Sequence, residues 1–354
     1  MSLLPLATGP SLTAVPGPFW LLTTLHLLTF VLHLAAMSSL LGGVLVVLAD
    51  RSPDRWSRPA VRRLLALFPV LMAATVTLGI APLLFLQLSY GRVAYSAAIT
   101  SAVFWFLVPF LAMSAYGCLY AASHRPAGDP RAGRWLHVAV AFLFLVSLVY
   151  SSTFSLAEHP DAYARLYASS TSGLVLNPDV ASWLPRWLQA VAGAAALGAL
   201  VTRLVARDDD ALRATAARVL AGGAVLAAVA AASRLALDAG LASRLGAIGL
   251  TAMAAGAILP LAGAVLGRGA GGGRDRLVGA LLILGLVASV VARHVGRLAT
   301  LAGTFDPAAP PVESQWGVFT IFVVCLLGAV GTIGWMLRAW FAASPAPGGP
   351  RPAP

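Results

Sequence analysis

The sequence is poor in charge and in cysteine, and it contains no lysine at all. Charged side chains make up 10% of its 354 residues, whereas a soluble domain carries about a quarter. Hydrophobic residues make up 59%. This balance excludes an ordinary soluble domain and indicates a membrane protein with several spans. We expect an all-α fold, because only helices and closed barrels satisfy the backbone in lipid and the apolar runs are too long for barrel strands.

The few cysteines and the arginines exclude further classes of protein. Cys118 and Cys325 lie in apolar segments, which argues against a disulfide framework. There is no Cys-x-x-Cys-His motif, so a covalently attached c-type haem is excluded. The net charge of +11 comes entirely from arginine. In so apolar a chain we expect these arginines to mark cytoplasmic loops and not to bind nucleic acid.

Apolar segments long enough to span a bilayer divide the chain into about nine expected transmembrane helices. Residues 1–17 form an expected N-terminal leader, 18–342 the transmembrane bundle and 343–354 a proline-rich tail. Arginines crowd the connections after the first, third, fifth and seventh segments, so we expect the N-terminus outside and the C-terminus in the cytoplasm. The segments cover approximately 19–49, 64–88, 95–122, 136–156, 183–206, 212–238, 243–267, 277–301 and 315–340.

Ionisable residues inside these spans are candidates for function. His26 and His33 lie seven residues apart in the first segment, and therefore on one helical face. Arg293, His294 and Arg297 lie close together in the eighth. Counted from the cytoplasmic arginines at about 1.5 Å per residue, we expect His33 and His294 at similar depth beneath the outer surface.

Three interpretations of these residues remain open. Imidazoles at matched depth near arginines suit a b-type haem, in which arginine pairs with the propionates. The histidines could instead be hydrogen-bonded within the bundle, or lie at its rim. A transport pathway could use Arg234, Asp238 and Arg293, with Arg234 and Asp238 as an i,i+4 pair. Residues Glu158–Asp161 are interpreted as a polar loop turn or a weak metal site.

Several short motifs occur in a recognisable order. His33 is followed nine residues later by Gly42 of a Leu-Gly pair, and residues 78–91 contain Leu-Gly-Ile-Ala, then Leu, Gln and Tyr-Gly. Leu174–Pro178 reads Leu-Val-Leu-Asn-Pro, and His294–Arg297 reads His-Val-Gly-Arg. Together these motifs resemble subunit I of the cytochrome bd quinol oxidases, over the first five segments and a short piece of the eighth.

The resemblance implies roles for individual residues. His33 stands where that family has a haem-ligating histidine, and His294 stands where it has a glutamate that serves the oxygen-reducing haem pair. Arg297 stands where the family's arginine holds a propionate, with Arg293 beside it. Gln189 replaces the histidine that ligates the low-spin haem.

The resemblance also implies cofactors, partners and an activity class. It implies one or two haems b, with haem d as an alternative, in a multi-pass protein of the bacterial cytoplasmic membrane surrounded by lipid. A second membrane subunit, an extracytoplasmic cytochrome and quinol are the implied partners of a possible oxidoreductase. The loop that would bind quinol is reduced to residues near 240–244, and Met253 is displaced from the low-spin haem position. We therefore expect a haem-b electron-transfer protein whose haem-pair site is partly kept, with a cofactor-free membrane scaffold and a small-solute transporter as alternatives.

Overall fold

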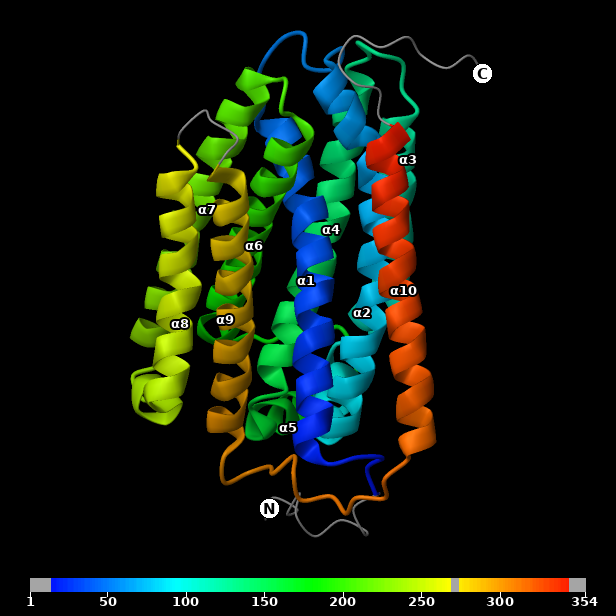
Figure 1. Cartoon of the computed structure of the whole chain (residues 1–354). Helices are drawn as coiled ribbons and strands as arrows, with labels where there is room; N and C mark the ends of the chain where they lie inside the picture. Colours follow the sequence, from blue (N-terminus) through cyan, green and yellow to red (C-terminus); the bar gives the residue numbers. More distant parts are fainter. Residues whose placement is uncertain (1–13, 269–273, 344–354) are drawn as a thin grey trace.

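The computed structural model of the chain describes residues 14–268 and 274–343. Nine of the ten helices in these residues are long and apolar enough to cross a membrane, which confirms the multi-pass helical bundle (Figure 1). Most of the expected leader and tail, residues 1–13 and 344–354, lies outside the described residues. The helices are α1 (Phe19–Ala49), α2 (Pro59–Thr100), α3 (Ala102–Ser123), α4 (Arg131–Leu156), α5 (Pro160–Ser169), α6 (Val180–Val205), α7 (Asp210–Leu237), α8 (Leu241–Leu266), α9 (Asp275–Leu301) and α10 (Trp316–Ala343).

Two elements differ from the expected pattern. The polar residues near Gly91 suggested a connection after residue 88, but α2 continues to Thr100 through a kink at Tyr90, whose φ and ψ are −129° and 16°. The connection expected after α4 contains the ten-residue helix α5, which begins with a proline that is compatible with the first helical turn. α5 is too short and too polar to register as an apolar segment.

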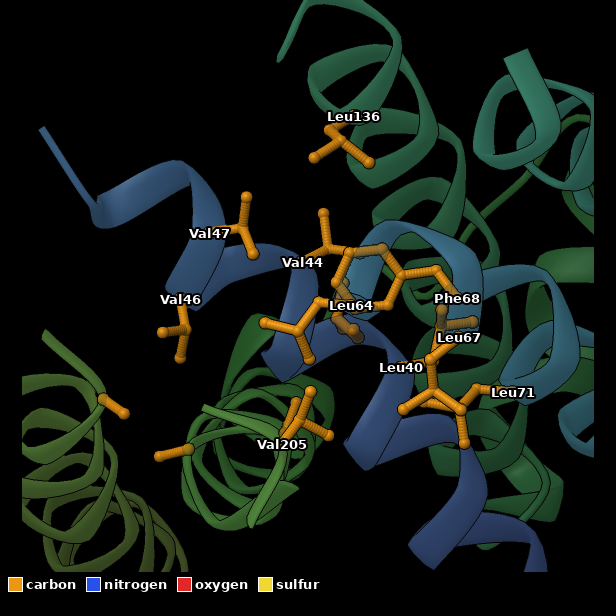
Figure 2. Packing of buried hydrophobic residues seen from close by; sticks show 14 of the residues in the cluster. Leu40, Val44, Val46, Val47, Leu64, Leu67, Phe68, Leu71, Leu136 and Val205 are labelled. Carbon is orange, nitrogen blue, oxygen red and sulfur yellow. The ribbon is translucent and has the colours of Figure 1, made fainter. Parts of the chain in front are cut away.

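α1 lies within the bundle and contacts α2, α6, α4, α7 and α9. Figure 2 shows the largest apolar cluster, in which Val44 of α1 packs with Phe68 of α2, near Leu136 of α4 and Val205 of α6. Val44, Phe68 and Leu136 have no exposed surface. These contacts fix the half of α1 that lies toward its C-terminus and thereby position the half that carries the histidines.

Two glycines allow α1 and α6 to meet backbone to backbone. A β-carbon at Gly42 would overlap the carbonyl group of Ala194, and one at Gly198 would overlap the backbone of Gly42 and Gly43. Small residues permit such close helix crossings in membrane proteins. The Leu-Gly motif of the first segment therefore has a packing role.

α10 lies at the edge of the bundle, against α2 (Figure 1). Its large apolar side chains are mostly exposed, for example Leu327 at 65% and Trp335 at 68%. In a membrane-spanning helix such side chains contact lipid tails. The bundle therefore presents an apolar outer surface, as a multi-pass membrane protein requires.

Candidate functional site

Two imidazoles of α1 are hydrogen-bonded to the backbone of α2. Nδ1 of His33 lies 3.0 Å from the carbonyl oxygen of Thr75, and Nδ1 of His26 lies 3.0 Å from that of Pro82. A carbonyl oxygen only accepts, so each Nδ1 carries the proton and donates it. The lone pair is therefore on Nε2 of each ring, as it is in a histidine that binds a metal through Nε2.

Phe30 separates the two histidines. Its ring centroid lies 5.8 Å from that of His26 and 6.5 Å from that of His33, and the planes are nearly parallel. Gly79 of α2 gives His33 its place, because a β-carbon at residue 79 would lie 2.9 Å from the imidazole. The Leu-Gly-Ile-Ala motif thus has a steric reason to carry glycine.

α9 meets α1 at the level of Phe30. The guanidinium carbon of Arg293 lies 5.8 Å from the Phe30 centroid, within reach of a cation–π interaction. The next residue, His294, is half-buried, and its Nδ1 is buried without a hydrogen-bond partner. His294 lies within electrostatic range of His26 and Arg297. Among the described residues, no hydrogen bond or ring contact joins it to His33.

Glu158 connects this region to a cluster of arginines. Its side chain is 4% exposed and pairs with Arg186 of α6, and its Oε1 lies 3.3 Å from Nε of Arg297 on α9. Burial alone would raise the pKa of the Glu158 carboxyl, but Arg186 and Arg297 outweigh burial and lower the pKa from 4.5 to about 2. Glu158 therefore stays ionised. It lies in the turn between α4 and α5, as expected, and the structure adds its pairing with the two arginines.

The arginine cluster extends to Arg293 and Arg234. Nη2 of Arg293 donates to the carbonyl oxygen of Arg186 at 3.4 Å. Nη2 of Arg234 lies against Gly296, where a β-carbon would be 2.6 Å away. The expected ion pair between Arg234 and Asp238 is replaced, because Asp238 pairs with Arg244.

Gln189 lies between two small cavities. Its Nε2 donates to Oγ of Ser289 at 3.1 Å. One cavity, of about 60 Å³, lies among α1, α6, α7, α8 and α9. The other, of about 40 Å³, is lined by Gln189 and Met253 together with three arginines. A larger cavity, of about 390 Å³, lies near residues 52–60 and 208–211, at the opposite end of the bundle.

The structure thus brings most of the expected site residues into one region and adds three to it. His294 and Arg297 lie within electrostatic range of His26, Arg293 lies against Phe30, and Gln189 lines a cavity with Arg293, whereas no hydrogen bond or ring contact among the described residues joins His33 to these α9 residues. Glu158 and Arg186 were missed, and their pairing joins positions 28 residues apart. The sequence feature that could have revealed this pair is Glu158 itself, an isolated glutamate in an arginine-rich chain. His26, the third addition, was noticed but was not included among the ligands.

Comparisons with known proteins identify no relative. No protein-family model matches the sequence, and no curated protein matches it. Among the described residues, no group of three or more His, Cys, Asp or Glu side chains could hold a metal ion. The resemblance to the oxidase subunit therefore stays a prediction.

Proposed function

We propose that this chain binds b-type haem within a membrane and transfers electrons near the extracytoplasmic face. His33 and His294 would be axial ligands, and Arg297 with Arg293 would pair with the propionates or tune the redox potential. The observation that supports this most is the bond from His33 Nδ1 to the Thr75 carbonyl, which leaves Nε2 free to bind iron. One or two haems b, with haem d as the alternative, remain the expected cofactors.

The side chains present, two imidazoles and two guanidinium groups, suit a b-type haem. Imidazole is the usual axial ligand of a b-type haem, and guanidinium is a good partner for a carboxylate. The buried Nδ1 of His294 has no partner within the described residues, so its ring remains available to a ligand. When bound, the haem would supply one-electron redox chemistry.

The chain's own residues would orient and insulate such a group. Thr75 would hold the His33 ring in one tautomer, and Gly79 would leave room for it. Glu158 would hold Arg297 in place through their ion pair. The apolar surface of the bundle would keep bulk water away from the ligands.

The placement in the cell follows from the arginine distribution and not from the fold alone. If all nine long apolar helices cross the membrane, an odd number of crossings would put the two ends of the bundle on opposite sides. With the arginine-rich connections in the cytoplasm of a bacterial cell, the histidines lie near the outer face. An extracytoplasmic cytochrome would then be the nearest electron-transfer partner, with a second membrane subunit or quinol as alternatives.

A cofactor-free scaffold with the same fold is the second candidate. The two cavities near Gln189 measure about 60 and 40 Å³, whereas ligand pockets usually measure about 300 Å³ or more. A haem would require the helices there to separate. This tight packing is what a protein without a prosthetic group would have.

A visible absorption spectrum separates the two candidates. The full-length protein is expressed with added haem, purified in detergent and measured oxidised and dithionite-reduced. We expect Soret and α bands that disappear in His33→Ala and His294→Ala, while His124→Ala at the opposite end of the bundle keeps them. A colourless wild-type protein would refute haem binding and favour the scaffold.

A further inference from the structure

The cavity of about 40 Å³ between α6, α7, α8 and α9 has an unusual lining. Its charged residues are Arg186, Arg234 and Arg293, and it contains no acidic residue. Gln189 and Ser289 add polar groups to the wall. Every charged group that faces this cavity is therefore a cation and a hydrogen-bond donor.

The carboxylates around the cavity do not neutralise these cations. Glu158 accepts from Arg186 and Arg297 and so balances one of the two. Asp238 pairs with Arg244, which lies outside the cavity lining. Among Arg186, Arg234, Arg293 and Arg297, one carboxylate leaves three positive charges without a balancing partner.

The donors of these arginines are also incompletely used. The side chain of Arg186 is 5% exposed, and its Nε is buried without a hydrogen-bond partner. Among the described residues, Arg234 makes no hydrogen bond and no ion pair within 4 Å. A buried charge without a compensating partner is unfavourable, so an anion among these arginines would be stabilising.

We propose that this cavity binds one small inorganic anion of halide size, held between Arg186, Arg234 and Arg293. A volume of about 40 Å³ exceeds the roughly 10–15 Å³ of cavity space that one water molecule requires, so the space admits a small ion. Three guanidinium groups supply charge-assisted hydrogen bonds, and Ser289 and Gln189 complete the polar wall. The site does not involve His33 or His294, but it shares Arg293 with the proposed haem site, so it is tested on the haem-free protein.

The same positive charge could attract a carboxylate or phosphate that belongs to a larger molecule. A haem propionate or a lipid headgroup would have to insert one charged end between the helices. The cavity volume favours the free ion, because a macrocycle or a glycerol backbone does not fit inside it. The three sources share one chemistry, a single negative charge, and an experiment can separate them.

The test uses the haem-free, full-length protein in detergent, in gluconate buffer at constant ionic strength. Chloride is titrated in place of gluconate, and thermal unfolding is followed by tryptophan fluorescence. We expect a saturable rise in Tm of roughly 4 °C at a hundredfold excess over Kd. Equilibrium dialysis with ³⁶Cl⁻ should give one ion per chain, displaced by bromide, without the need for any variant.

Two variants locate the site. Arg234→Gln should abolish both the Tm shift and chloride binding, whereas Arg165→Gln, which changes an exposed arginine of α5, should keep both. A wild-type protein without saturable chloride binding would overturn the proposal. So would chloride binding that anionic phospholipid abolishes, because the site would then belong to the headgroup, or binding that loaded haem abolishes, because it would belong to a propionate. A missing haem spectrum would leave the chloride result unaffected.

Discussion

Replacing Glu158 with glutamine tests how strongly the buried ion pairs stabilise the arginine-rich end of the bundle. The substitution keeps the shape of the side chain but removes the charge that Arg186 and Arg297 share. Removing one partner of a buried pair costs about 3–5 kcal/mol. The fall in the Glu158 pKa from 4.5 to about 2 corresponds to roughly 3 kcal/mol, since each pKa unit is about 1.36 kcal/mol.

The magnitude translates into a measurable change in Tm. With an unfolding entropy of about 2.1 cal/mol/K per residue, 354 residues give a loss of roughly 4 °C for 3 kcal/mol. Glu313 is the only other glutamate of the chain, and it is exposed. Glu313→Gln is therefore the matched control, and its Tm should stay within about 1 °C of the wild type.

The pH dependence gives a second measurement of the same interaction. Because the folded-state pKa of Glu158 is lowered, its contribution is complete above the unfolded pKa of about 4.5 and is lost as the pH falls toward 2. The wild type and Glu158→Gln should therefore differ in Tm at pH 7 and converge toward pH 2. Equal Tm values at pH 7, or a difference that persists unchanged at pH 2, would refute the assignment of Glu158 as a buried ionised group.

Two further substitutions test the packing and the charge at other places. Gly198→Val should lower Tm by several degrees, because overpacking of the α1–α6 contact costs at least about 1–3 kcal/mol, while Gly222→Val, where a β-carbon meets no atom within 4 Å, should change it little. Arg203→Gln should cost about 3–5 kcal/mol, because Arg203 donates to buried Asp275 at 2.8 and 3.0 Å, whereas exposed Arg207→Gln should be nearly neutral. Thermal unfolding in detergent measures all four variants, and equal losses within either pair would contradict the structure.

The number of spans was predictable because hydropathy acts locally along the chain. Each membrane helix must be apolar over about 20 residues, and this requirement is visible without tertiary information. The ends of the second span were not predictable, because whether residues 89–95 continue a helix depends on the packing of Tyr90 near Phe305 and Arg297.

The candidate site was only partly predictable for a related reason. The histidines and arginines stood out as ionisable residues in apolar segments. Their partners did not, since the bonds from His33 to Thr75 and from Arg297 to Glu158 join positions 42 and 139 residues apart. Arg203 lies near the end of the fifth predicted segment, and the sequence does not show that it is 2% exposed and paired with Asp275. Hydropathy assigns a residue to a span or a loop but not to a partner.

The glycine contact between α1 and α6 has a mechanical consequence. Because the two backbones touch at Gly42 and Gly198, this point is the natural pivot for any tilt of α1. His33 lies nine residues from Gly42, about 14 Å along the helix. A tilt of about 10° would swing the imidazole by roughly 2 Å, enough to break a hydrogen bond of 3.0 Å to Thr75. A slight tilt of α1 about the glycine contact would thus change the hydrogen bonding of His33.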